Sequence, residues 1–207
     1  MNTEFNKVML KAAIAVAVAA PLFAHAESTF NNGAGSPITA SARLDFQITI
    51  PRVLFLQVGT GSNMATNAAV DLISFTVPGA SLGNGTAVAG TGGDLANGTV
   101  TAKVVGNNGD ITLTSTTTGA LGNGAGDSIS FGQISTTAAS NTSATVLQPP
   151  ALADAATTTT TVTATNKVVN QDAKWTFAYK NQSVQAPGTY GGVNTNNSRV
   201  TYTASMP

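Results

Sequence analysis

The stretch LDFQITIPRVLFLQV, Leu44 to Val58, is the most hydrophobic part of the chain after its first 26 residues. In its first half, apolar side chains (Leu44, Phe46, Ile48, Ile50) alternate with polar ones (Asp45, Gln47, Thr49). This period of two is typical of a β-strand with one face on a core. Beyond Pro51 the apolar run is almost continuous, as in a strand buried on both faces. Because proline cannot donate a hydrogen bond to a sheet, we expect one core strand that bends at Pro51. A short buried helix is the alternative.

Residues 1–26 have the three parts of a secretory signal peptide. Two lysines precede a short apolar core at residues 12–24, and Ala24-His25-Ala26 matches an A-x-A cleavage site. That core is shorter than the roughly 20 residues that a transmembrane helix needs. We therefore expect a secreted mature chain that begins at Glu27, without membrane insertion, and that lies outside the cell, on the cell surface or in the periplasm.

Removal of this leader also removes the only histidine, and the chain contains no cysteine. The mature chain thus lacks the base or thiol of the common nucleophilic triads and the usual zinc and copper ligands. Its carboxylates are scattered singly, mostly where aspartate begins or closes a turn: Glu27, Asp45, Asp71, Asp94, Asp110, Asp127, Asp154 and Asp172. A hydrolase with paired carboxylates is the catalytic alternative. We expect no enzyme activity, no cofactor and no metal.

The charge content indicates which partners to expect. Charged residues make up 9% of the chain, with 9 Lys and Arg against 9 Asp and Glu. Such a chain offers no basic patch for nucleic acid and no cationic face for lipid. We expect partners among copies of itself or other surface and pilus proteins, with polysaccharide as the alternative.

Alternating, β-favouring segments cover much of the remaining chain. The expected strands lie at residues 69–77, 99–105, 110–118, 128–134, 144–147, 157–161, 174–181 and 199–206. The turn at Asn108-Gly109 predicts a hairpin between 99–105 and 110–118, and the threonine run at 157–161 predicts an exposed strand. We predict a single all-β domain over residues 42–207, an antiparallel immunoglobulin-like β-sandwich of about 9 strands.

Three Gly-Asp pairs, at residues 93–94, 109–110 and 126–127, have two interpretations. Aspartate and backbone carbonyls suit calcium, so the pairs would then be calcium-binding turns. Alternatively, they punctuate a meander of strands. The nonapeptide calcium repeat is matched only in fragments, which favours punctuation.

Aromatic side chains gather in the C-terminal third. Trp175, Phe177 and Tyr179 alternate along one face of the segment 174–181, and Tyr190 follows in a turn. On an exposed face such a row would stack against sugars, which makes Trp175, Tyr179 and Tyr190 the candidate contacts to glycan or partner. Since no other large aromatic cluster is available to fill a core, we favour the core for this row.

The end of the chain resembles a known family. Pro187-Gly188-Thr189-Tyr190 followed by Val200-Thr201-Tyr202-Thr203 resembles the G-x-Y turn and final strand of chaperone-usher pilus subunits, including the spore-coat-U-like ones. It is also similar to the closing strand of WxL-type bacterial surface domains. The resemblance implies an exported β-sandwich. The cysteine pair of many such pilins and the W-x-L tripeptide are both absent.

Residues 27–41 are small and polar, and they predict a flexible N-terminal arm before the domain. If this arm donates a strand to a neighbouring subunit, Phe30 and Ile38 are its candidate anchors. We expect a structural or adhesive cell-surface protein, a fimbria-like subunit or extracellular matrix component that acts through protein-protein contacts. A non-catalytic carbohydrate- or cell-wall-binding module is the alternative function.

Overall fold

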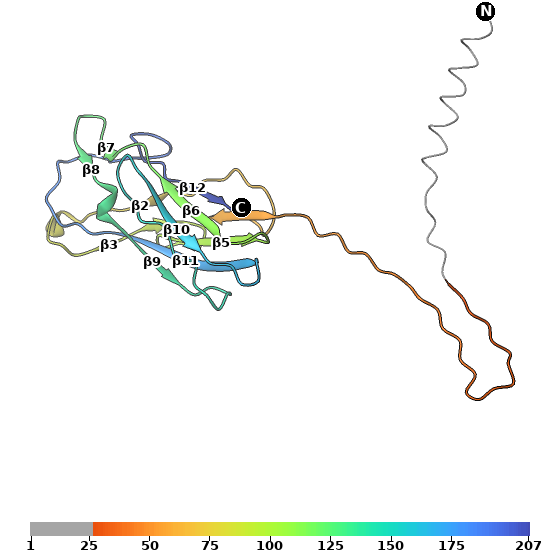
Figure 1. Cartoon of the computed structure of the whole chain (residues 1–207). Helices are drawn as coiled ribbons and strands as arrows, with labels where there is room; N and C mark the ends of the chain where they lie inside the picture. Colours follow the sequence, from red (N-terminus) through yellow and green to blue (C-terminus); the bar gives the residue numbers. More distant parts are fainter. Residues whose placement is uncertain (1–26) are drawn as a thin grey trace, which may run out of the picture. The chain divides into compact units, whose positions relative to one another are not determined.

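A computed structural model describes residues 27–207, so the expected signal peptide lies outside the described residues. The chain divides into two compact units, one that ends at Ile50 and one that spans Pro51–Pro207. Residues 27–50 contain no helix or strand, and every strand belongs to the second unit (Figure 1). In the described part of the chain, no helix has the length and hydropathy to cross a membrane.

The larger sheet is antiparallel and is built around β11, the longest strand. β1 pairs with β5, β5 pairs with β11, and β11 pairs in turn with β9 and, at its end, with β3. Their bounds are β1 Leu54–Val58, β3 Val88–Ala89, β5 Thr99–Gly106, β9 Ile134–Ala139 and β11 Val169–Tyr179. β1 and β9 each have one unpaired edge.

The smaller sheet is also antiparallel, in the order β10-β6-β12. Its bounds are β6 Ile111–Thr116, β10 Thr157–Val162 and β12 Thr201–Ser205. Two short pairs complete the unit: β2 (Ile73–Ser74) with β4 (Thr91–Gly92), and β7 (Leu121–Gly122) with β8 (Ser128–Ile129). Two 3₁₀ turns, η1 (Gly79–Ser81) and η2 (Phe131–Gln133), lie between strands. The all-β, antiparallel prediction is confirmed.

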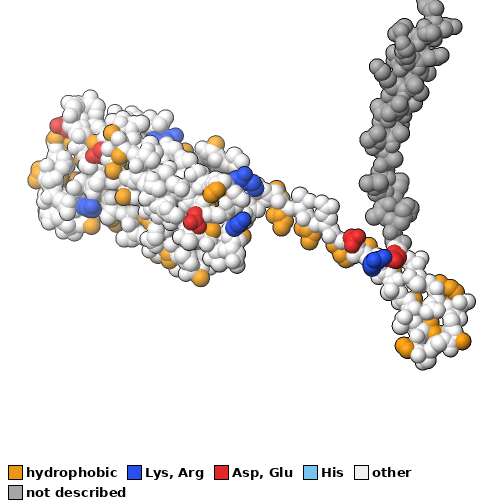
Figure 2. Space-filling view, in the orientation of Figure 1, with side chains coloured by type: hydrophobic (Ala, Val, Ile, Leu, Met, Phe, Trp, Pro, Cys, Tyr) orange, Lys and Arg blue, Asp and Glu red, His pale blue; other side chains and the backbone are white. Residues whose placement is uncertain are grey.

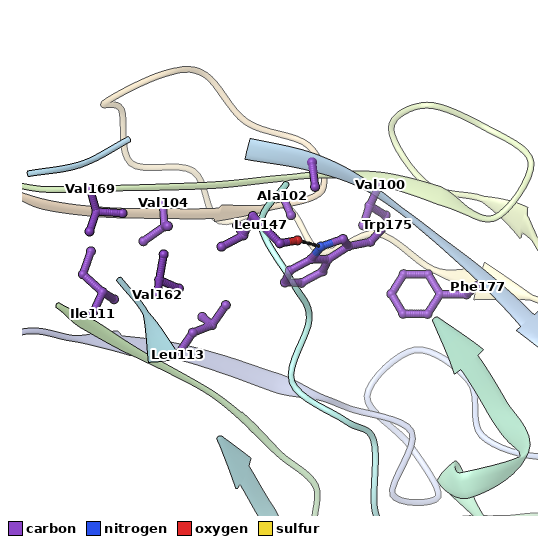
Figure 3. Close-up of a cluster of buried hydrophobic side chains, with 11 residues drawn as sticks. Val100, Ala102, Val104, Ile111, Leu113, Leu147, Val162, Val169, Trp175 and Phe177 are labelled. Atoms are coloured by element: carbon purple, nitrogen blue, oxygen red, sulfur yellow. Dashed lines mark hydrogen bonds between the residues drawn. The ribbon is translucent and has the colours of Figure 1, made fainter. Parts of the chain in front are cut away.

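Both sheets contribute to one hydrophobic core. Along β5 every second residue is buried, which is the alternation of a strand with one face on a core. Val104 and Val169 from the larger sheet lie close to Ile111 and Val162 from the smaller one (Figure 3). Trp175 lies in the same cluster, between Leu147 and Phe177 (Figure 3). The segment 157–161 is the exposed-edge strand that its threonines predict, with only alternate residues covered.

The predicted hairpin between 99–105 and 110–118 is wrong, although both strands exist. β5 pairs with β1 and β11, whereas β6 pairs with β10 and β12, so the connection crosses from one sheet to the other. The alternate burial of residues along β5 and β6 is compatible with a hairpin and with two strands in different sheets. The turn is bound by a residue from between β10 and β11: Gly109, at φ +109°, donates its N–H to Lys167 O at 3.0 Å.

The predicted core strand exists only beyond Pro51. β1 begins at Leu54, whereas residues 44–50 form no strand and their apolar side chains face solvent. The prediction that this half packs on the core is therefore wrong. No strand within residues 27–207 pairs with it, and an extended segment without a partner leaves its backbone groups to water.

Other expected strands are shorter than their sequence pattern. The segment 69–77 pairs only at Ile73–Ser74, and the segment 144–147 makes a single parallel bridge from Val146 to Asp172. Such two-residue pairings raise the number of strands in residues 27–207 to twelve.

Truncation of the central core residue should destabilise the fold strongly. We expect Trp175→Ala to lower the free energy of unfolding by about 3–5 kcal/mol, since it opens a cavity and removes a buried hydrogen bond. In the monomer, Phe46→Ala should change it by less than about 0.5 kcal/mol, because Phe46 is exposed. Urea unfolding of both variants measures the two values. A large loss of unfolding free energy for Phe46→Ala would show that residues 44–50 pack on the core.

Candidate functional site

The aromatic row predicted as a contact surface lies mainly inside the domain. Trp175 is fully buried, and its indole Nε1 donates a hydrogen bond to Leu147 O at 2.8 Å (Figure 3). Its ring centroid lies 5.4 Å from that of Tyr202. No part of Trp175 is available to a glycan, and the core interpretation is confirmed for this residue.

The two predicted tyrosines do not form an exposed row with Trp175. Tyr179 is buried beside Phe75, with ring centroids 6.4 Å apart, and burial raises the pKa of its hydroxyl. Tyr190 is half-buried, and its hydroxyl donates to Ala186 O at 2.9 Å within the same turn. The three residues therefore do not come together as a stacking platform.

The predicted arm anchors, Phe30 and Ile38, are both exposed. Around them the arm makes local contacts only: Asn31 Nδ2 donates to Thr39 O at 3.1 Å, and Arg43 pairs with Glu27 at 2.5 Å. Two isolated apolar residues eight positions apart do not make the alternating face of a strand.

A longer apolar row follows directly after Arg43. The side chains of Leu44, Phe46, Ile48 and Ile50 are 69%, 86%, 84% and 75% exposed. Hydrophobic side chains gather along this segment in Figure 2. Since every second residue is apolar, an extended backbone places all four on one face. An uncovered apolar row of this size indicates a surface for protein contact.

The alternating pattern of the sequence predicts that this row packs on the core. One signal against that interpretation is the change of period at Pro51, from strict alternation to a continuous run. A second is length, because one strand over residues 44–58 would far exceed the usual 5–6 residues. The two halves are separate elements.

The point where this segment joins the domain is fixed by side chains of the second unit. Asn107 Oδ1 accepts a hydrogen bond from Val53 N, and Asn107 Nδ2 donates to Pro51 O, both at 2.8 Å. The C-terminal residue is held at the same place, since Arg52 and Asn108 both donate to Pro207 O. The domain thus begins at Pro51.

The second unit has free sheet edges. β1 and β12 lie side by side but belong to different sheets, and each pairs on one side only. Apolar side chains of both strands, and Met206 just after β12, pack against the core yet remain half-buried; the strand residues are Leu56, Val58, Tyr202 and Ala204. No edge strand (β1, β9, β10 or β12) carries a charged residue or a proline. Such residues are what usually protects an edge from pairing with another chain.

Among residues 27–207, the carboxylate of Asp172 is buried. Asp172 accepts hydrogen bonds from the backbone N–H of Thr142 and of Ser143, both at 2.8 Å, and from the Thr142 hydroxyl. Burial raises the pKa of this carboxyl, but the hydrogen bonds outweigh burial and hold its pKa well below the usual range. Every polar contact belongs to the fold, so Asp172 ties the loop at 140–143 to β11.

The aspartates of the Gly-Asp pairs all accept hydrogen bonds from within the fold, two of them within their own turn and Asp110 from a distant segment. Asp94 accepts from Thr101 N and Asp110 from Ala164 N, each at 2.8 Å, while Asp127 accepts from Asn123 Nδ2 at 2.9 Å. Among residues 27–207, no three His, Cys, Asp or Glu side chains cluster as metal ligands would. The contacts support the punctuation interpretation.

No family model, curated protein or solved structure matches this chain. The candidate site therefore rests on geometry: an exposed apolar segment and an unprotected edge.

The Asp172 cluster predicts how stability depends on pH. Because its pKa is lower in the folded than in the unfolded chain, its contribution is present above the unfolded pKa of about 3.9 and is lost as the pH falls through the folded pKa. At neutral pH, Asp172→Asn should cost about 1–3 kcal/mol, since it leaves buried donors without an acceptor. The variant should also flatten the acid limb of the stability curve.

Urea unfolding of both proteins between pH 7 and pH 2 measures this effect. Asp127→Asn is the matched control, since Asp127 is exposed. An acid limb of equal slope in the wild type and in Asp172→Asn would show that Asp172 does not carry the pH dependence.

Proposed function

We propose that this chain is an exported structural or adhesive protein, a fimbria-like subunit or matrix component, whose copies assemble by strand addition. Residues 44–50 of one copy pair with the free edge of β12 in another. The observation that supports the proposal is the exposed apolar row at Leu44, Phe46, Ile48 and Ile50. Burial of one such side chain stabilises a protein by about 1.5–3 kcal/mol relative to exposure. An assembled copy that buries the row therefore has a lower free energy than a free copy.

The two-sided pattern of the segment suits β12. The side chains of β12 that face inward are apolar (Tyr202 and Ala204, followed by Met206 just beyond the strand), and those that face outward carry hydroxyls (Thr201, Thr203, Ser205). In the donated segment the apolar row would continue the inner face, while Asp45, Gln47 and Thr49 would continue the polar one. Register follows from this pattern, because a slip of one residue would reverse both faces.

Pro51 separates residues 44–50 from β1, which supports their role as a donated strand. Proline has no N–H to give to a ladder, so β1 and the donated segment do not form one continuous strand. The hydrogen bonds of Asn107 to Pro51 and Val53 fix where the domain starts, and they leave residues 44–50 without a partner in the second unit's sheets. An extended segment that adds to a sheet edge gains affinity from its backbone and specificity from alternate side chains.

The alternative, a carbohydrate- or wall-binding module, needs an exposed aromatic row. Trp175 and Tyr179 are buried, so the residues that suggested this function do not support it.

Assembly should depend on the apolar row. We expect the chain from Glu27 onward to form oligomers or filaments, and we expect Phe46→Asp with Ile48→Asp to leave monomers, because charges in the inner face oppose burial. Light scattering and negative-stain microscopy measure both. Phe30→Asp with Ile38→Asp is the matched control, because both are exposed apolar residues that precede the apolar row. Loss of assembly in the control alone would show that residues 27–41, and not residues 44–50, connect the copies.

Cross-linking tests the acceptor edge. Because the chain has no cysteine, single-cysteine variants give unambiguous products. A mixture of Ile48→Cys and Ala204→Cys chains should form disulfide-linked heterodimers on mild oxidation. Ala138→Cys, on the inner face of the β9 edge of the other sheet, should not react with Ile48→Cys. Preferential reaction at Ala138 would assign the acceptor to β9.

A further inference from the structure

The outer face of the smaller sheet is an array of hydroxyl side chains. Along β10, β6 and β12, every second side chain points away from the core, and all of these are threonine apart from one serine: Thr157, Thr159 and Thr161 on β10, Thr112, Thr114 and Thr116 on β6, and Thr201, Thr203 and Ser205 on β12. The residues between them, such as Ile111, Leu113 and Val162, face the core. We call this array the threonine face.

The register aligns the threonine face in rows across the strands. Each row takes one residue from each strand: Thr157, Thr116 and Thr201; then Thr159, Thr114 and Thr203; then Thr161, Thr112 and Ser205. Neighbouring side chains in a row are therefore about 4.8 Å apart, and successive rows follow about 7 Å along the strands. The hydroxyls repeat in two directions.

The side chains of the array are held in place. Threonine is branched at Cβ, which restricts its first side-chain torsion in a strand. Cross-strand contacts restrict it further: the hydroxyls of Thr116 and Thr157 lie 2.9 Å apart, and the Thr114 hydroxyl donates to Thr203 O at 3.4 Å. Each residue presents a methyl group beside a hydroxyl that both donates and accepts.

The three rows contain no charged and no aromatic residue. Charged residues stand just before two of the strands: Asp110 and Arg199 each come two residues before the first threonine of the array on β6 and β12. An ionic ligand would find no counter-charge, and a sugar ring would find no aromatic surface to stack on. The array fits a ligand that is uncharged, forms hydrogen bonds and repeats in two dimensions.

We propose that the threonine face binds ice. The surface of an ice crystal is an uncharged lattice of water molecules, and it repeats in two directions on the length scale of strand spacing. Hydroxyls at fixed positions bond to lattice waters, while the methyl groups between them favour ordered over liquid water at the contact. The array lies within one copy, so ice binding does not require strand addition; in the proposed assembly the outer residues Asp45, Gln47 and Thr49 would lie beside β12 at the border of the array.

The test is inhibition of ice recrystallisation, together with thermal hysteresis, by the chain from Glu27 onward. We expect the wild type to arrest crystal growth and Thr159→Lys, in the middle row, to weaken this about tenfold, which equals about 1.4 kcal/mol of adsorption free energy. Thr137→Lys, an equally exposed threonine on β9, is the matched control and should retain activity. Thermal unfolding verifies that each variant is folded.

A conservative pair of variants defines the contact. Thr159→Val keeps the shape and the methyl groups and should keep most of the activity, whereas Thr159→Ser loses a methyl group and should lose more. A wild type without effect on ice, or an equal loss in Thr137→Lys, would overturn the proposal. So would binding to microcrystalline cellulose that Thr159→Lys abolishes while ice growth is unaffected, since the face would then bind polysaccharide.

Discussion

A strand with one apolar face is stable only where a neighbouring strand satisfies its backbone and a core covers its side chains. β5, β6 and β11 meet both conditions, and their alternate residues build the core around Trp175. The segment 44–50 has the same alternation, but no strand of the described chain covers it. The same physical pattern thus has two outcomes in one chain, and the difference is whether a partner is present.

A set of hydrogen bonds at the start of the domain, which we call the clamp, separates the covered strands from the uncovered segment. Asn107 and Asn108, in the turn between β5 and β6, bind Pro51, Val53 and the C-terminal Pro207 through their amide groups. The turn therefore gathers the first and last residues of the second unit, and it does so without disulfides. Everything beyond the clamp belongs to the packed domain, whereas residues 44–50 keep their apolar row in water.

The period of two was sufficient to predict the all-β fold, the buried aromatic face at Trp175 and the exposed threonine strand at 157–161, because side-chain direction in a strand is a local property. Pairing is not local. Asn108-Gly109 has the chemistry of a hairpin turn, yet the flanking strands join different sheets, and only the contacts of β10, β11 and β12 reveal it. Likewise, nothing local distinguishes Leu44–Ile50 from a core strand, since an apolar face has the same sequence whether it is covered within the chain or by another molecule.

The arginines on either side of the apolar segment have a consequence for proteolysis. Arg43 precedes Leu44 and Arg52 follows Pro51, so a protease specific for basic residues has a site at each end of the connector. In the assembly that we propose, a docked segment is shielded and a free one is open to cleavage. Cleavage after Arg43 alone would leave residues 44–50 on the domain, whereas a copy cleaved after Arg52 would keep its β12 edge but have no strand to donate. Such a copy could join an assembly only at an end, and cleavage of free copies after Arg52 would then limit how long the assembly grows.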